Sequence, residues 1–228
     1  MVHIAVFGST GFLGQEICKS AKSKGWMVSP VLNSLDGGST LLKNDFAWLE
    51  QLSNVGKLDG IVWAQGRNGS GTVLSTSTSE LEDLMEANIT FVASTLKLLV
   101  DKKLMNKPCR SVVLGSVWQN LARTNKFAYT VSKSAVAGLV GSIASDMADY
   151  GLSINAVLPG VVDSPMTRAN LSNPSLERIQ RESLGGELVS ATEVADVVTF
   201  LISANSSGIN GQSIVVDHGW SKARYVEH

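Results

Sequence analysis

The feature that most constrains the fold is a short apolar run near the start of the chain that ends in a glycine-rich turn. Val2–Phe7 is apolar apart from one histidine, and Gly8–Gly14 follows with the spacing G-x-x-G-x-x-G. A helical segment, Gln15–Lys24, comes next and stops at Gly25. In a strand–turn–helix unit, such glycines let backbone N–H groups and the helix N-terminus approach a pyrophosphate. An ordinary strand-to-helix turn has the same pattern, so the motif alone leaves both interpretations open.

The rest of the chain continues this alternation of strands and helices. No linker divides its 228 residues and no internal repeat is present, which predicts a single domain over residues 1–228. The alternation predicts an α/β fold of the doubly wound Rossmann type, with three α/β/α layers and a mostly parallel seven-stranded sheet. Beyond the first strand and helix, the expected strands are 26–32, 40–43, 61–66, 111–116, 152–158 and 211–217, and the expected helices are 79–103, 127–150 and one that starts at 191.

Charge and cysteine content narrow the possible partners. The net charge is −1 without a block of like charges, so neither nucleic acid nor an anionic membrane is an expected partner. The first apolar run has no basic residue before it, which favours a strand over a signal peptide, and the uncharged stretch Ser134–Ser145 is too short to cross a bilayer.

Cys18 and Cys109 form no paired motif, which favours reduced thiols in a cytoplasmic protein. The histidines lack metal-ligand spacing, so we expect no metal site.

A tyrosine and a lysine four residues apart, Tyr129 and Lys133, indicate proton-transfer chemistry. On a helix this spacing puts both side chains on one face, roughly 5–6 Å apart between Cβ atoms. An ammonium beside a phenol favours the ionised phenol and lowers its pKa from about 10. Such a phenol can exchange a proton near neutral pH, as carbonyl reduction or alcohol oxidation requires. The same pair occurs by chance in many helices, so the interpretation depends on the residues around it.

Two upstream residues strengthen this interpretation. Ser116 ends an apolar strand, and Asn88 lies inside a long helical segment. Together with Tyr129 and Lys133 they resemble, in order and approximate spacing, the tetrad of the short-chain dehydrogenase/reductase family. The segment from Tyr129 to Met166, YTVSKSAVAGLVGSIASDMADYGLSINAVLPGVVDSPM, is similar to that family almost position by position. The resemblance spans nearly the whole chain and is weaker in its first third.

The resemblance implies an NAD(P)-dependent oxidoreductase that interconverts a carbonyl and a secondary alcohol by hydride transfer. Tyr129 would be the general acid/base, Lys133 would lower its pKa and hold the nicotinamide ribose, and Ser116 would donate a hydrogen bond to the substrate oxygen. Asn88 would hold a water that links Lys133 to solvent, with a solvated surface asparagine as the alternative. The expected substrate-binding residues are Ser116, Trp118, Gln119 and Tyr129, although the tryptophan could equally be a core aromatic.

The resemblance also implies the cofactor-binding residues. The segment that starts at Pro159 matches the family stretch that binds the nicotinamide carboxamide. Asp45 matches an aspartate that contacts the adenine ring, although it could equally be a helix N-cap. The full set of expected cofactor contacts is Gly8, Ser9, Thr10, Gly11, Phe12, Leu13, Gly14, Asn33, Ser34, Asp45, Ala64, Gly66, Tyr129, Lys133, Pro159, Gly160, Val162 and Ser164.

Three departures from the family pattern affect the finer assignment. The commonest single-domain members have G-x-x-x-G-x-G, and the spacing here resembles the extended, sugar-nucleotide branch. Residues 63–66, Trp-Ala-Gln-Gly, keep only the final glycine of the family's N-N-A-G. At the end of the second strand, Leu32 and Asn33 stand where an NAD-binding Asp or a phosphate-binding Arg is usual. We therefore expect either NADP or NAD as cofactor, with a slight preference for NADP because no carboxylate excludes its phosphate.

A stripe of small residues predicts a close packing partner for the helix 127–150. Ser134, Gly138, Gly141 and Ser145 lie on one side of it, and a glycine inside a helix costs roughly 1 kcal/mol relative to alanine. Tight packing within the chain would compensate, as would a second copy. The resemblance implies the second copy, in a homodimer or homotetramer formed through helices 79–103 and 127–150. It also implies a short substrate lid at about 167–190.

Two alternatives stand beside the oxidoreductase acting on a small-molecule carbonyl or alcohol. A non-catalytic NAD(P)-binding sensor or scaffold would account for the altered glycine spacing and the missing asparagines, but it has no need for the tyrosine. A nucleotide-sugar-modifying member of the family would also account for the glycine spacing. The chain leaves little room for the C-terminal substrate domain of that branch.

Overall fold

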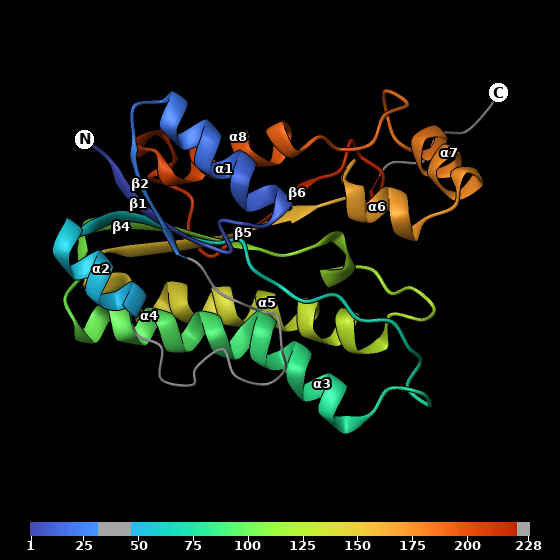
Figure 1. Ribbon diagram of the computed structural model, residues 1–228, viewed down its shortest axis with the longest axis horizontal. Helices are drawn as coiled ribbons and strands as arrows, with labels where there is room; N and C mark the ends of the chain where they lie inside the picture. The colour runs from blue at the N-terminus through green and yellow to red at the C-terminus, as the bar shows by residue number, and fades with distance from the viewer. Residues whose placement is uncertain (32–46, 223–228) are drawn as a thin grey trace.

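The chain folds around a parallel sheet whose strands alternate with helices (Figure 1). This computed structural model describes residues 1–31 and 47–222. The strands in this part of the chain are β1 (His3–Phe7), β2 (Met27–Val31), β3 (Leu58–Trp63), β4 (Met105–Leu114), β5 (Leu152–Pro159) and β6 (Ser213–Val216). They pair in parallel in the order β2-β1-β3-β4-β5-β6, which confirms the predicted Rossmann-type fold. The predicted strand 40–43 lies outside the described residues.

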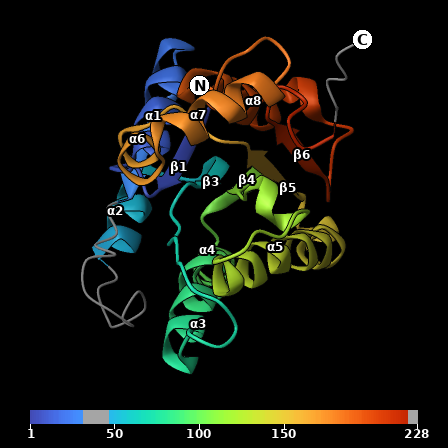
Figure 2. The same ribbon diagram turned by 90° about the vertical axis from the view of Figure 1, so that its right-hand side faces the viewer.

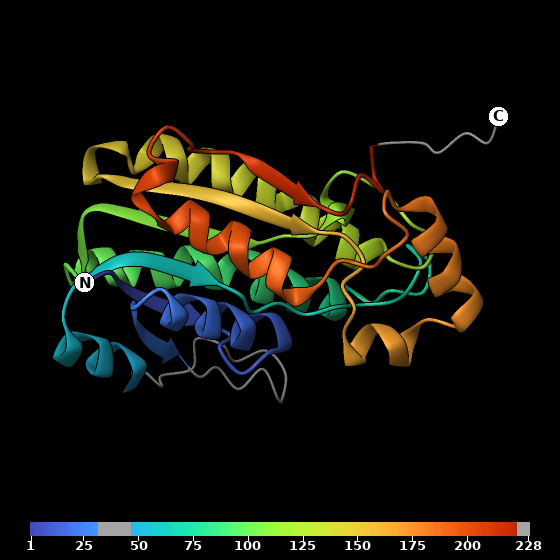
Figure 3. The ribbon, with the colours of Figure 1, turned by 90° about the horizontal axis from the view of Figure 1, so that it is seen from above.

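Helices cover both faces of the sheet and give the predicted three layers (Figures 1 and 3). One face carries α1 (Phe12–Ser23) and α8 (Ala191–Ile202). The opposite face carries α2 (Ala47–Val55), α4 (Phe91–Asp101) and α5 (Phe127–Asp146). A separate cluster of buried apolar side chains fills the space on each face, and removing this surface from water is the main source of stability.

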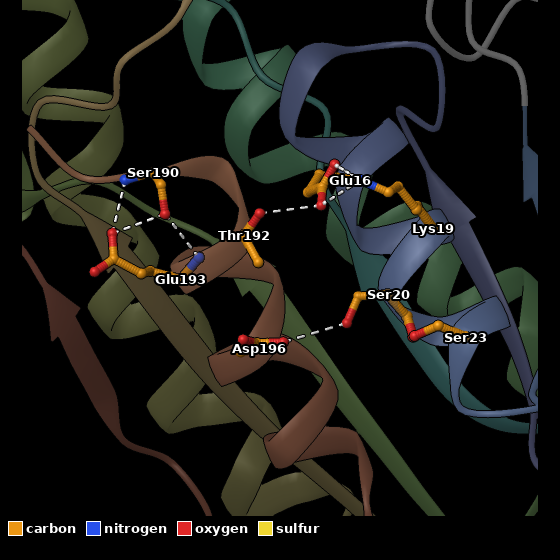
Figure 4. Close-up of polar contacts among 8 residues, drawn as sticks. All are labelled: Glu16, Lys19, Ser20, Ser23, Ser190, Thr192, Glu193 and Asp196. Atoms are coloured by element: carbon orange, nitrogen blue, oxygen red, sulfur yellow. Dashed lines mark hydrogen bonds and ion pairs between the residues drawn. The ribbon is translucent and has the colours of Figure 1, made fainter.

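Polar contacts hold α8 against α1 (Figure 4). Thr192 donates a hydrogen bond of 3.1 Å to Glu16, and Ser20 donates one of 3.4 Å to Asp196. Ser190 begins α8 in a capping box with the glutamate three residues later, as the S-x-x-E pattern predicts. These contacts fix the start of α8 beside α1, at the same edge of the sheet as the glycine turn.

The carboxyl ends of the parallel strands meet at one edge, where glycines follow three of them. Gly8 follows β1 with a φ of +74°, a left-handed conformation that favours glycine. Gly115 follows β4, and Gly160 follows β5, where a Cβ atom would lie 2.6 Å from the Cβ of Asp217. The chain order reverses between β1 and β3. This edge therefore contains the topological switch point at which doubly wound sheets bind ligands.

Two short helices, α6 (Pro165–Asn170) and α7 (Asn173–Glu182), stand at this edge (Figures 1 and 2). An isolated bridge between Val162 and Val189 closes the base of the segment that contains them. The expected lid, 167–190, corresponds to these helices and to the turn that follows them.

The predicted helix 79–103 is interrupted by one π-helical turn. It consists of α3 (Thr78–Met85), the π turn Glu86–Thr90 and then α4. Asn88 lies in the π turn with only 2% of its surface exposed. Single π turns inside α-helices occur frequently at functional sites, because the extra residue changes where a side chain points.

Candidate active site

Tyr129 and Lys133 lie close together on α5, as their spacing predicts, and the helix places them at the carboxyl edge of the sheet. The Lys133 ammonium is 5.8 Å from the centre of the Tyr129 ring. It donates a hydrogen bond of 3.0 Å to the carbonyl of Leu114, the last residue of β4. Burial lowers the pKa of Lys133 to about 8. The lysine is therefore a buried amine that titrates close to neutral pH.

The expected lowering of the phenol pKa is not found: the net shift is upward, and burial is its largest cause. Burial raises the pKa of Tyr129 above its usual value, and a hydrogen bond with Ser116 offsets this rise only in part. The i, i+4 spacing predicts proximity, but it carries no information about how far both groups leave water, which favours the neutral form of each. At neutral pH Tyr129 is thus a protonated phenol that can donate its proton.

Ser116 follows β4 and caps a short 3₁₀ turn. Its Oγ accepts a hydrogen bond of 3.4 Å from the backbone N–H of Trp118, which leaves the hydroxyl proton for the side facing Tyr129. The structure separates the two substrate residues expected in this turn. Trp118 lines the cavity beside Tyr129, whereas the Gln119 Nε2 donates a hydrogen bond of 2.9 Å to Ser213 of β6. The Gln119 side chain does not line the cavity.

Asn88 connects α5 to the loop that follows β3. Its Nδ2 donates to the Ser132 Oγ at 2.9 Å and to the carbonyl of Arg67 at 3.2 Å, and its Oδ1 accepts from the Arg67 N–H at 3.1 Å. Gly66 lies close to both Asn88 and Lys133, because a Cβ there would be 2.9 Å from the Oδ1 and 3.4 Å from the Nζ. This close approach explains why the chain keeps the last glycine of N-N-A-G. The burial of Asn88 excludes the alternative of a solvated surface asparagine.

Aromatic packing replaces the first asparagine of N-N-A-G. The Trp63 Nε1 donates a hydrogen bond of 2.9 Å to Thr95, and its ring stacks on Phe7 with 6.0 Å between the ring centres. Both strands β1 and β3 are thereby tied to the helix layer at their carboxyl ends. Ala64, which takes the second position, is partly buried on the opposite face of the sheet.

The glycine-rich turn leaves the start of α1 without a side-chain cap. Gly11 is its N-cap residue and the first turn contains no acidic side chain, whereas α3 and α8 have serine capping boxes. A Cβ on Gly14 would overlap the carbonyl of Gly8, so only glycine allows this close turn. Uncapped N–H groups at a helix N-terminus attract phosphate oxygens. The turn therefore fits the pyrophosphate of a nicotinamide cofactor.

The other expected cofactor residues near this turn differ in their exposure and in whether they line the cavity. Ser9 is buried and donates a hydrogen bond of 3.3 Å to the carbonyl of Val31. Thr10 and Phe12 are exposed, and Leu13 lines the cavity beside Tyr129. Three further expected residues lie outside the described part of the chain: Asn33, Ser34 and Asp45.

The expected nicotinamide-binding segment follows β5. Pro159, Gly160 and Val162 line the cavity beside Tyr129. Ser164 caps α6, with its Oγ accepting from the N–H of Thr167 at 3.1 Å and donating to the Thr167 hydroxyl at 3.0 Å. The Ser164 hydroxyl thus serves the helix cap in this structure.

A cavity of about 430 Å³ joins these segments. Its walls include Ser116, Tyr129, the segment after β5, and α6. They also include Arg123 and Lys126, which the sequence interpretation missed. Lys126 lies 5.6 Å from the centre of the Tyr129 ring. Its position three residues before Tyr129 was a usable helical signal, whereas Arg123 lies in a loop without periodicity.

No cluster of three or more His, Cys, Asp or Glu side chains in residues 1–31 and 47–222 could hold a metal ion. Cys18 and Cys109 are free thiols. The fold and the cavity residues instead define a class: Rossmann-type oxidoreductases that use a nicotinamide cofactor.

A family model described as enoyl-(acyl carrier protein) reductase matches residues 46–221. The chain belongs to the short-chain dehydrogenase/reductase family. It is an NAD(P)-dependent oxidoreductase that interconverts a carbonyl and an alcohol.

Two relatives and one solved structure illustrate the similarity. Dehydrogenase/reductase SDR family member 6 from Xenopus laevis is 29% identical over 173 residues, which cover 73% of this chain and 71% of the relative. The 3-oxoacyl-(acyl-carrier-protein) reductase FabG from Salmonella typhimurium is 28% identical over 94% of this chain and 95% of its own length. The ligand-free aldohexose dehydrogenase of Thermoplasma acidophilum superposes with a TM-score of 0.86 and 23% identity, over 100% of this chain and 96% of that one. This last likeness supports the fold alone.

Proposed function

We propose that Tyr129 exchanges a proton with the substrate oxygen while Ser116 donates a hydrogen bond to the same oxygen. The observation that carries the proposal is that both hydroxyl-bearing side chains line one cavity, with the buried Lys133 ammonium 5.8 Å from the phenol ring. The nicotinamide cofactor, when bound, supplies or accepts the hydride. The uncapped start of α1 holds its pyrophosphate, and the segment that starts at Pro159 borders its reacting end.

The protonated phenol is the form of Tyr129 that carbonyl reduction requires. Burial keeps Tyr129 protonated, so the phenol starts as the proton donor. As a phenolate forms, the Lys133 ammonium stabilises its negative charge, and this stabilisation is larger in a buried site than in water. Because the pKa of Lys133 is about 8, the supporting charge decreases at alkaline pH. Asn88 positions the segment around Gly66 so that Lys133 keeps its place.

The variant Tyr129→Phe tests this assignment. It keeps the ring and its packing but removes the oxygen, so turnover should fall by at least about a hundredfold, the usual contribution of a general acid. The measurement is oxidation of reduced cofactor with a panel of ketones, alongside cofactor binding by calorimetry, which should be unchanged. Retention of most of the activity would contradict the proposal. Cofactor binding without turnover of any ketone by the wild type would favour the sensor instead.

For the cofactor, we propose a slight preference for NADP over NAD. Leu32 and Asn33 supply neither a carboxylate that excludes the 2′-phosphate nor a cation that binds it. The two dissociation constants should therefore lie within about tenfold of each other, which corresponds to about 1.4 kcal/mol. Calorimetry with both reduced cofactors at one ionic strength measures the ratio. A hundredfold preference in either direction would mean that a charged residue near the second strand reaches the ribose.

We propose that the protein works as a homodimer or homotetramer that packs through helices 79–103 and 127–150, which comprise α3, α4 and α5. Within the described residues, α5 is the one helix with the length and mean hydropathy, 1.2, of a membrane span, yet only 28% of that window is buried in the chain. Val136 and Val140 face the core, so the unburied apolar surface lies on the other side of the helix. A second copy would cover this surface.

The remaining roles concern the lid and the cell compartment. We propose that α6 and α7 act as the lid of the single domain, because Met166 and Asn170 of α6 line the cavity that also contains Tyr129. We also propose a cytoplasmic location without a nucleic-acid or membrane partner. The net charge of −1 and the free thiols support this proposal.

A further inference from the structure

The charges around the cavity are all of one sign. Among its described lining residues, Arg123 and Lys126 are the charged ones, and no carboxylate lines it. Both cations come from the segment that connects Ser116 to Tyr129. Arg123 is exposed and Lys126 half-buried at the cavity wall, so an anionic ligand there would meet two cations and no competing carboxylate from the lining.

Lys126 contributes positive charge to the cavity, but its ammonium already donates hydrogen bonds to neighbouring residues. Its ammonium donates to the Asn68 Oδ1 at 2.8 Å, to the carbonyl of Gly69 at 2.9 Å and to the Ser70 Oγ at 3.2 Å. All of these acceptors are neutral, so the charge is not cancelled. Burial, and then the neighbouring Arg123, lower the pKa of Lys126, as expected for two cations that share a site without an anion.

The Arg123 guanidinium has N–H donors that are available to a ligand. Its guanidinium carbon is 5.9 Å from the centre of the Trp118 ring, and it has no acceptor in the described part of the chain. Trp118 is itself held edge-on by Trp220, with 5.8 Å between the ring centres. Stacking on a fixed ring limits the motion of the guanidinium, and a planar guanidinium binds carboxylate or phosphate oxygens in pairs.

We propose that the carbonyl substrate carries an anionic group, a carboxylate or phosphate, which binds Arg123 in the positive field of Lys126. The proposal rests on the proposed function, because Tyr129 must be the reacting centre for this end of the cavity to receive the substrate. In reduction, the carbonyl carbon gains a hydride from the reduced cofactor and its oxygen gains the Tyr129 proton. The anionic group is unchanged and serves to orient the carbonyl.

The decisive experiment compares keto acids with uncharged isosteres. 4-Oxopentanoate and its 3-oxo and 5-oxo homologues are each paired with the corresponding amide, and kcat/KM is measured with reduced cofactor. At least one carboxylate should exceed its amide by about tenfold or more, as a charge-assisted pair requires. Arg123→Gln should lower kcat/KM for the carboxylate by about tenfold, mainly through KM, and leave the amide within about twofold.

Control variants identify the origin of the effect. Arg123→Lys keeps the charge without the paired donors and should give an intermediate loss. Lys24→Gln removes an exposed positive charge at the end of α1 and should change neither substrate. Raising the ionic strength should increase KM for the carboxylate and not for the amide. Equal losses for carboxylate and amide in Arg123→Gln would overturn the proposal, because they would indicate a structural role.

Further measurements distinguish failure of the anion site from failure of the proposed oxidoreductase function. Turnover of neutral ketones with equal kcat/KM for acids and amides would overturn the anion site and leave the oxidoreductase assignment intact. If no ketone is turned over, calorimetry of 4-oxopentanoate with the cofactor-loaded protein decides: binding that Arg123→Gln abolishes supports the anion site, and absence of binding overturns it. Replacing the carboxylate by a phosphate monoester identifies which anion is preferred. A larger dissociation constant for the cofactor in Arg123→Gln than in the wild type would assign Arg123 to cofactor binding and overturn the proposal.

Discussion

The two sides of α5 contrast in what surrounds them. On one side Lys133, Val136 and Val140 are buried against the sheet and the neighbouring turn. On the other side Gly138 and Gly141 are exposed, and a Cβ built on either would meet nothing within 4 Å. Among residues 1–31 and 47–222, contacts surround the buried side, whereas nothing packs closely on the two glycine positions of the exposed side. Within the described part of the chain, tight intrachain packing, one of the two explanations for the glycines, therefore does not account for Gly138 and Gly141.

Under the proposed function, residues on the buried side serve the chemistry and residues on the exposed side serve the proposed assembly. A buried lysine without a carboxylate partner reduces stability, so it requires a functional reason. A glycine in an exposed helix also reduces stability, by roughly 1 kcal/mol, and no packing within the described residues compensates for it at Gly138 or Gly141. Variants on the two sides should consequently affect different observables.

The largest effect is expected for Lys133→Met on the buried side. The variant removes both the charge beside Tyr129 and the proposed ribose contact, so turnover should fall by about a hundredfold or more and cofactor affinity should weaken. Steady-state kinetics and calorimetry measure the two losses separately. A loss confined to turnover would show that the ribose contact is wrong.

The same variant should show how the buried charge affects stability. In the wild type the pKa of Lys133 is lowered from 10.5 to about 8, so between these values the unfolded chain binds a proton that the folded chain does not. The free energy of unfolding of the wild type, relative to Lys133→Met, should therefore rise with pH across this window. The rise should be at most about 3.5 kcal/mol, from about 1.4 kcal/mol per pKa unit. Denaturant unfolding at pH 7 and pH 10 measures it, and a constant difference would mean that the amine is hydrated.

A smaller effect, on assembly alone, is expected on the exposed side. Gly138→Leu should reduce the oligomeric mass, because a leucine occupies space that a neighbouring helix needs. The fold should persist, since leucine favours a helix over glycine by somewhat less than about 1 kcal/mol. Size-exclusion chromatography with light scattering reports the mass. Gly208→Leu is the matched control, as its Cβ also meets nothing within 4 Å but lies outside α5. An unchanged mass in Gly138→Leu would place the interface elsewhere.

Much of the fold was predictable because its signals are local. Apolar runs that end at Gly8 or Gly115, and a helix that stops at Gly25, mark their own boundaries in the sequence. The pair of Tyr129 and Lys133 was predictable because helical spacing fixes proximity.

Other features of the site depend on contacts between distant segments. The π turn at Asn88 was not predictable, because one additional residue barely changes a helical pattern of apolar side chains. Gln119 turns toward Ser213, which lies far away in sequence, so its direction could not be read from its neighbours. The raised pKa of Tyr129 follows from burial by the complete fold, which spacing does not report.

The cavity draws its walls from segments spread along most of the chain, from Leu13 on α1 to Leu171 after α6. Partial unfolding of any of these segments would remove part of the binding surface, so a partly folded chain should bind cofactor poorly. Cofactor binding and global folding are consequently linked equilibria. At a cofactor concentration about a hundred times its dissociation constant, the folded state gains about 2.7 kcal/mol over the unfolded state. The supply of cofactor would thus set how long the chain survives unfolding and proteolysis, in addition to how fast it turns over.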